Sequence, residues 1–118
     1  MPVVSATHFL YVLLGGAAGS LLRYSAGLLL PSATFFVNMT GSFLIGLCAT
    51  LLPAGSPWRL LLITGFLGGY TTFSAFQWEL FSAIQSGFPW QAALNALASV
   101  LVGLIACWAG SVLANMLR

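Results

Sequence analysis

The sequence predicts an all-α membrane protein, a single four-helix transmembrane domain over residues 1–118 in which the third helix is broken. The first observation is composition: 60% of the residues are hydrophobic and 3% are charged, whereas a soluble domain has about 25% charged residues. The second is a series of four apolar runs, each long enough for the about 20 residues that cross a bilayer. The third is a cluster of glycines and hydroxyl residues inside the third run.

Proline- and glycine-containing stretches separate the four runs. The connecting segments PSAT, PAGSPW and SGFPW each stop a helix. Trp58 and Trp90 stand at the ends of runs, where an aromatic belt is expected. The predicted spans cover residues 8–30, 33–52, 58–86 and 91–117. The connections are short, so we expect a compact membrane unit with no soluble domain.

The arginines give little information on orientation in the membrane. Arg59 and Arg118 fall on the side of the N-terminus, Arg23 falls toward the other side, and the chain has no lysine. Because Lys and Arg in the loops set the orientation, so slight an imbalance leaves both a single orientation and insertion in both orientations open.

The segment GGYTTFSAF, residues 68–76, is unusual for a helix that serves only as an anchor. Gly68 and Gly69 each cost roughly 1 kcal/mol in a helix interior, and Thr71 and Thr72 can satisfy freed backbone groups. Irregular backbone at membrane depth persists only where protein covers it or water reaches it. Broken helices place carbonyl oxygens where they can hold ions. We therefore expect a break in this segment, with a packing kink made by small residues as the alternative.

Aromatic and polar side chains near this segment could contact a small solute. Phe73 and Phe76 share one helix face, and although phenylalanine usually contacts lipid or core, its ring edge carries partial positive charge that can face an anion. Thr34, Asn38 and Ser42 share a face of the second run, and Asn38 brings amide N–H donors to membrane depth. Hydrogen bonding between helices is the alternative for this stripe.

Two charged residues and two pairs of glycines are the remaining candidates for a functional or packing role. Arg23 would cost at least about 3 kcal/mol if buried, so it either extends to the interface or anchors a polar network. Glu79 is the sole carboxylate, and it either has a structural role or is the proton carrier of an exporter. Glycines with the spacing of close helix contacts occur at Gly15/Gly19 and Gly65/Gly69.

Enzymatic and nucleic-acid functions find no support. The single His and the single Glu belong to different regions of the chain, and no spacing of His, Cys or carboxylate typical of a metal site occurs. The net charge of +2 is too small to indicate a nucleic-acid partner. A membrane transporter or channel remains. Its rivals are a dual-topology proton-coupled small-molecule exporter that uses Glu79 and a non-transporting assembly subunit.

Three segments together resemble the signature segments of the CrcB/Fluc family of small bacterial fluoride channels: GGAAGSLLRY, TFFVNMTGSFLIG and TGFLGGYTTFSAF. The resemblance covers the whole chain. It implies a fluoride-selective ion channel that passively exports fluoride from the cytoplasm across the bacterial plasma (inner) membrane and protects against its toxicity. It also implies an antiparallel dual-topology homodimer in the lipid bilayer, with two pores and a central structural sodium ion.

The resemblance further implies roles for individual residues. The sodium ion would be held by backbone oxygens of Gly68 and Thr71. The fluoride pore would contain Asn38, Phe73, Ser74 and Phe76. The supporting polar residues would be Arg23, Thr34, Thr72 and Glu79. Two departures from the family pattern are Ala75 in place of a threonine, which removes a hydroxyl and predicts an altered rate, and Ala33 in place of a glycine before Thr34.

Overall fold

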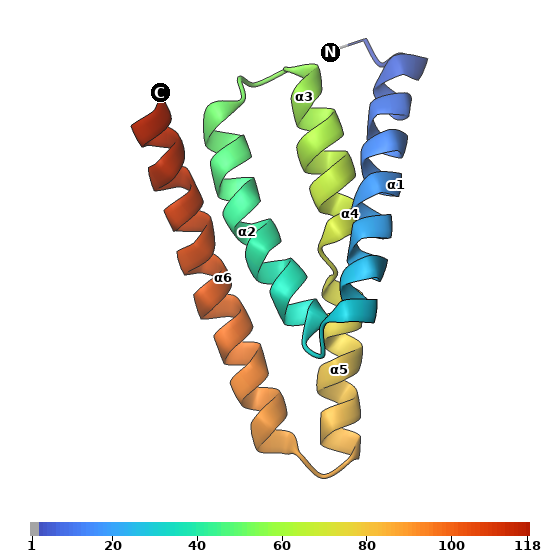
Figure 1. The fold of residues 1–118 in the computed structure, drawn as a ribbon, viewed down its shortest axis with the longest axis vertical. Helices are drawn as coiled ribbons and strands as arrows, with labels where there is room; N and C mark the ends of the chain where they lie inside the picture. Colours follow the sequence, from blue (N-terminus) through green and yellow to red (C-terminus); the bar gives the residue numbers. More distant parts are fainter. Residues whose placement is uncertain (1–2) are drawn as a thin grey trace.

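The computed structural model describes residues 3–118, and these residues form helices and no β-strand. The three long helices are α1 (Ala6–Leu29), α2 (Ala33–Leu51) and α6 (Pro89–Leu117). Between α2 and α6 lie α3 (Pro57–Arg59), the π-helical segment η1 (Leu60–Leu67), α4 (Gly68–Tyr70) and α5 (Phe73–Gln85). Figure 1 shows the α3–α4 segment beside α1, and α6 beside α2.

The long helices α1, α2 and α6 are apolar and long enough to cross a membrane, judged by length and composition. Large hydrophobic side chains such as Phe9, Leu29 and Trp90 are exposed on their outer surfaces. The buried positions of the same helices are mostly small, and glycine is the commonest residue among them. This inside-out distribution suits a protein whose outer surface contacts lipid, because small residues let membrane helices approach closely.

Glycines bring α1 against η1 and α4. A Cβ atom added at Gly15 would overlap the carbonyl oxygen of Leu61, and one at Gly19 would overlap that of Phe66. A Cβ atom at Gly69 would lie 2.6 Å from the carbonyl oxygen of Gly16. The two glycine pairs seen in the sequence therefore lie on facing surfaces of one helix contact.

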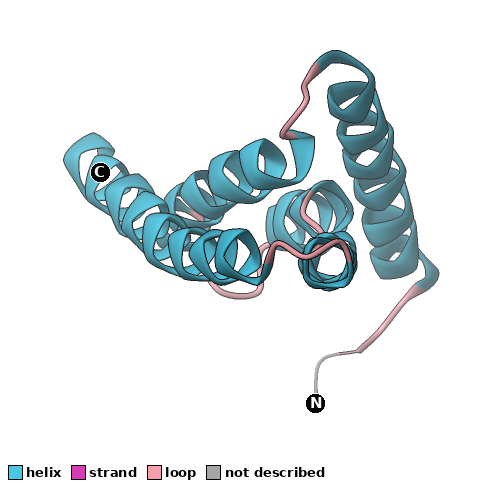
Figure 2. Cartoon of the chain, turned by 90° about the horizontal axis from the view of Figure 1, so that it is seen from below, coloured by secondary structure: helices cyan, strands magenta, loops and turns pink. Residues whose placement is uncertain are grey.

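A second glycine contact joins α2 to α6. A Cβ atom at Gly46 would overlap the carbonyl oxygen of Cys107, and one at Gly110 would overlap that of Phe43. The hydroxyls of Thr50 and Ser111, 2.8 Å apart, form a hydrogen bond across the same contact. Figure 2 shows the resulting arrangement, with the segment from α3 to α5 lying between α1 on one side and α2 with α6 on the other.

Two arginines hold the carbonyl end of α2. Arg59 Nη1 donates to the carbonyl oxygens of Ala49 at 3.2 Å and Leu52 at 2.9 Å, and Arg118 Nη1 donates to Thr50 O at 3.5 Å. Cations at this end of a helix complement its dipole. The start of α1 and the end of α6 lie at this end of the molecule, while the turn from α5 to α6 lies at the opposite end (Figure 1).

We predict that Gly110→Ala lowers the free energy of unfolding by about 1–3 kcal/mol, because the new methyl group overlaps the backbone of α2. Titration of purified protein in detergent with a denaturing detergent, followed by tryptophan fluorescence, measures the change. Gly27→Ala is the matched control, because a Cβ atom at Gly27 meets nothing within 4 Å. Equal destabilisation by the two substitutions would contradict the assigned contact.

Candidate functional site

A two-residue interruption separates α4 from α5. Thr71 (φ −88°, ψ 157°) and Thr72 (φ −149°, ψ 113°) are both extended. Gly68 and Gly69, at the start of the segment 68–76, are helical residues of α4. Gly69 packs against α1, so its lack of a side chain serves helix contact. The β-branched threonines that follow favour the extended backbone.

Asn38, on α2, pairs with the extended backbone at two points. Its Nδ2 atom donates to Thr72 O at 3.1 Å, and its Oδ1 atom accepts from Thr72 N at 2.8 Å. The amide thereby replaces both helical partners that Thr72 has lost. Because an amide nitrogen carries two N–H donors, one of them has no assigned acceptor among residues 3–118. Asn38 therefore holds the interruption and still offers a donor.

At the end of α4 some backbone carbonyl oxygens accept a hydrogen bond from the protein and others do not. Thr71 satisfies Leu67 O through its backbone N at 3.0 Å and its hydroxyl at 2.9 Å. Arg23 Nε donates to Gly69 O at 2.9 Å, so this half-buried arginine bonds to the backbone of α4. Within residues 3–118, the carbonyl oxygens of Gly68, Tyr70 and Thr71 accept no hydrogen bond from the protein. Such oxygens at a helix end are potential cation ligands.

Phe73 and Phe76 occupy the first turn of α5, which Thr72 caps by accepting from Ala75 N at 3.2 Å. Their ring centroids lie 6.1 Å apart with the planes tilted by 55°. Phe76 is 8% exposed and Phe73 71% exposed. One ring therefore packs into the molecule while its neighbour presents an open face beside the interruption. Ser74, also exposed, places its hydroxyl 3.5 Å from that of Thr72.

A cleft of about 370 Å³ lies along the interruption and gathers several of the predicted residues. Its polar lining comes from Asn38, Ser42, Thr71 and Thr72, and its residues also include Gly68 and Phe73. The hydroxyl of Ser42 donates to Asn38 O at 2.6 Å. The residues that line this cleft include no carboxylate, so an anion entering it meets amide and hydroxyl dipoles without a negative charge.

The polar stripe of α2 divides between two clefts. Thr34 and Arg23 line a second cleft of about 330 Å³, and Thr72 lines both. The Thr34 hydroxyl donates to Glu79 Oε1 at 2.6 Å, which ties the start of α2 to the middle of α5. The structure therefore places Glu79 with Thr34 and outside the lining of both clefts.

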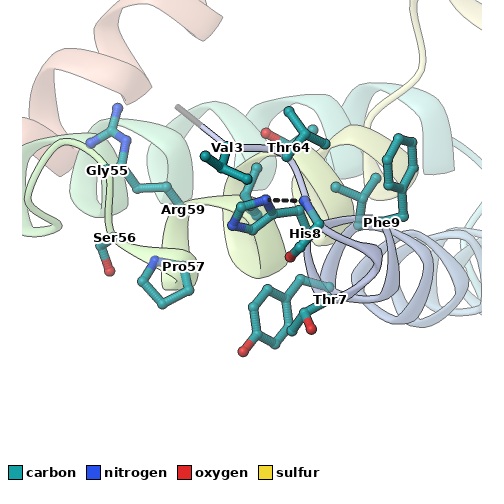
Figure 3. Close-up of a pocket in the computed structure, with 14 residues that line it drawn as sticks. Val3, Thr7, His8, Phe9, Gly55, Ser56, Pro57, Arg59 and Thr64 are labelled. Atoms are coloured by element: carbon teal, nitrogen blue, oxygen red, sulfur yellow. Dashed lines mark hydrogen bonds between the residues drawn. The ribbon is translucent and has the colours of Figure 1, made fainter. Parts of the chain in front are cut away.

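A third cleft, of about 780 Å³, lies between the start of α1 and the α2–α3 connection. Figure 3 shows His8 near its centre and Arg59 at its edge. His8 Nδ1 accepts from Ser5 N at 3.1 Å, and the Arg59 guanidinium is bonded to the end of α2. The His8 and Arg59 side chains of this cleft are therefore used by neighbouring helix ends.

One hydrogen-bonded pair at the site escaped the sequence analysis. Tyr70, at the end of α4, is 6% exposed, and its hydroxyl lies 2.7 Å from the Thr40 hydroxyl of α2. The signal was present, since a tyrosine inside an apolar run needs a partner when it is buried. The partner lies thirty positions earlier in the chain, however, and no local pattern connects the two.

Comparison with known proteins places this site in a wider group. Residues 10–111 match the family model described as CrcB-like protein, Camphor Resistance (CrcB). Relatives from Solibacter usitatus and Acidobacterium capsulatum are each 44% identical to the chain; the alignments cover 91% of the chain and 98% and 95% of the relatives. A Thermus thermophilus relative is 43% identical, with 87% and 91% covered. All three relatives carry the name fluoride-specific ion channel FluC.

The match to the family model spans the interruption, the Asn38 contact and both glycine contacts. The identities to the three relatives extend over nearly the whole chain. On these grounds the chain belongs to the CrcB family.

Proposed function

We propose that this chain is a fluoride-selective ion channel that exports fluoride passively from the cytoplasm and so protects the cell against its toxicity. The observation that carries the proposal is the site at the interruption, where a free Asn38 N–H donor and the exposed Phe73 ring lie beside extended backbone. The three relatives named fluoride-specific ion channel FluC support it. The chain is not an enzyme, because these groups bind and orient an ion without a bond being made or broken.

The chemistry of the site suits a small anion. Fluoride is compact and strongly hydrated, so a pore must replace its water with close hydrogen-bond donors. Asn38 Nδ2 and the Ser74 hydroxyl supply donors, and the ring edges of Phe73 and Phe76 supply weak positive potential. A full positive charge would hold the anion too tightly to let it leave, because conduction requires sites that are weak enough to release the ion. A narrow passage with few donors selects against the larger chloride ion.

The membrane architecture follows from the helices. We propose four spans, the third of which combines α3, η1, α4 and α5 and is broken at Thr71 and Thr72. Extended backbone at membrane depth needs cover from protein or a water-filled cavity. An antiparallel dual-topology homodimer supplies that cover, and it agrees with the nearly balanced arginines on the two sides. In the dimer the exposed Phe73 ring and Ser74 face a second copy of the chain along one of two pores.

A sodium ion at the centre of the dimer fits the oxygens present. Gly68 O and Thr71 O are hard ligands that accept no protein hydrogen bond within residues 3–118. Unpaired carbonyls at membrane depth are costly, and the same two oxygens from both copies would surround one cation. When bound, sodium would supply positive potential near the pores. Arg23, held on Gly69 O, would fix the carbonyl between them.

The driving force for export is the membrane potential. A cell interior negative by 100 mV favours the exit of one anion by about 2.3 kcal/mol. The channel therefore needs no nucleotide and no coupled proton.

We predict that liposomes containing the purified protein release fluoride rapidly and chloride slowly, as read with ion-selective electrodes. Phe76→Ile removes the buried ring edge and should slow fluoride release by more than about tenfold, equivalent to about 1.4 kcal/mol in the barrier. Phe81→Ile is the matched control on the same helix, since Phe81 is half exposed and lies beyond the site. It should conduct like the unchanged protein.

Absence of fluoride release from well-folded protein would overturn the channel proposal. In that case a pH gradient that drives uptake of an organic cation, lost in Glu79→Gln, would favour a proton-coupled exporter. The contact of Glu79 with Thr34 gives that carboxylate a structural role in the channel, so Glu79→Gln should leave ion selectivity intact.

We predict that Asn38→Asp lowers fluoride release by more than about tenfold. The carboxylate can still accept from Thr72 N, but it loses the donors to Thr72 O and to the anion, and it adds negative charge to the cleft. Asn115→Asp places the same change on an exposed part of α6 and is the matched control. Stopped-flow or electrode measurements on both variants test the expectation, and equal rates would refute the role given to Asn38.

A further inference from the structure

Tyr70 is the most buried tyrosine of the chain, and the proposed pore does not use it. It ends α4 at 6% exposure, whereas Tyr24 is 67% exposed. Its ring stacks on Phe66, one turn earlier, with centroids 5.6 Å apart and planes within 14°. Its hydroxyl reaches across to Thr40 at 2.7 Å. Burying a phenol in this way indicates a specific task for the hydroxyl, since phenylalanine would fill the same space without a polar group to satisfy.

The other hydrogen bond of the Thr40 hydroxyl shows which group donates in the Tyr70–Thr40 contact. The Thr40 hydroxyl lies 2.8 Å from Phe36 O, the usual acceptor for a threonine inside a helix. A hydroxyl has one proton and two lone pairs. Thr40 therefore donates to its own helix, and Tyr70 donates to Thr40. The result is a chain of two hydrogen bonds from the end of α4 to the backbone of α2.

Three residues of α2 contact the end of α4 and the interruption, one for each of residues 70, 71 and 72. Thr40 accepts from Tyr70, and Asn38 pairs with Thr72. Between these contacts, Gly41 lies so close to Thr71 that a Cβ atom there would overlap the threonine methyl group. Each residue from 70 to 72 therefore has its own contact with α2.

We propose that Tyr70 is a positioning residue for the sodium site, acting through its hydrogen bond to Thr40. This inference rests on the proposed function. Gly68 O and Thr71 O, the proposed ligands, lie two residues before and one residue after Tyr70. Tyr70 lies in the backbone between the two peptide groups that carry these oxygens, so holding Tyr70 in place limits how those groups move relative to one another. Loss of the anchor lets the end of α4 rotate, so the two oxygens converge less well on a cation.

The test measures how fluoride release depends on sodium. Liposomes with purified protein are prepared over a series of sodium concentrations, with N-methyl-glucamine as the replacement cation. Tyr70→Phe keeps the ring, its stack on Phe66 and its volume, and it removes only the hydroxyl. We expect the sodium concentration for half-maximal release to rise about fivefold or more, as expected for the loss of one buried hydrogen bond. The maximal rate at saturating sodium should change little.

Further variants separate positioning from general stability. Thr40→Val removes the acceptor and should raise the sodium concentration for half-maximal release as much as Tyr70→Phe does. Thr40→Ser keeps the hydroxyl and should have the sodium requirement of the unchanged protein. The double variant Tyr70→Phe with Thr40→Val should be no worse than either alone, because both remove one shared contact. Tyr11→Phe, the same change near the start of α1, is the matched control. Thr40→Val also tests the proposal if Tyr70→Phe fails to fold.

The outcomes distinguish this inference from the proposed function. Sodium-dependent release by the unchanged protein, with an identical sodium requirement in Tyr70→Phe or Thr40→Val, would overturn the role of Tyr70 alone. Fluoride release that is independent of sodium would overturn the sodium site and this inference with it. No fluoride release from the unchanged protein would overturn the channel itself.

Discussion

Backbone polar groups at membrane depth need partners from within the protein, because lipid offers none. In the long helices each backbone group finds its partner four positions away, but both backbone groups of Thr72 and the carbonyl oxygen of Thr71 do not. Asn38 resolves the conflict for Thr72 by supplying both an acceptor and a donor from one side chain. Arg23 supplies a donor to Gly69 O. The backbone around the interruption is stabilised by one polar side chain from α1 and one from α2. These hydrogen bonds require α1 and α2 to lie at fixed distances from it.

Glycine contacts set those distances. On one side Gly15 and Gly19 admit the backbone of η1, and on the other Gly46 and Gly110 admit that of α6 and α2. The backbones of α1 and of the η1–α4 segment are in direct contact at Gly15 and Gly19. The glycines one and two turns before Arg23 therefore set the distance across which its side chain bonds to α4. Packing and ion chemistry are therefore parts of one arrangement: the same small residues that join the helices bring the side-chain partners within hydrogen-bonding distance.

Much of this could be predicted from the sequence because it depends on local or compositional signals. Apolar runs and the prolines between them indicate where helices lie, and the segment with the paired threonines points to the site. The position of the extended residues could not be predicted, because glycine propensity suggested residues 68 and 69 whereas packing against α1 keeps them helical. Pairings such as Thr34 with Glu79 and Thr40 with Tyr70 join distant parts of the chain. Nothing in either local sequence specifies its partner.

The start of α1 and the end of α6 lie at the same end of the molecule (Figure 1). In the antiparallel dimer proposed above, the C-terminal end of one copy and the N-terminal end of the inverted copy then lie on opposite faces of the bilayer. A direct head-to-tail gene fusion of two such units cannot produce the pair, whatever the length of a soluble linker. A covalent tandem would need one additional membrane-crossing segment between the halves. Without it, two separately inserted copies are the simpler route to the same assembly.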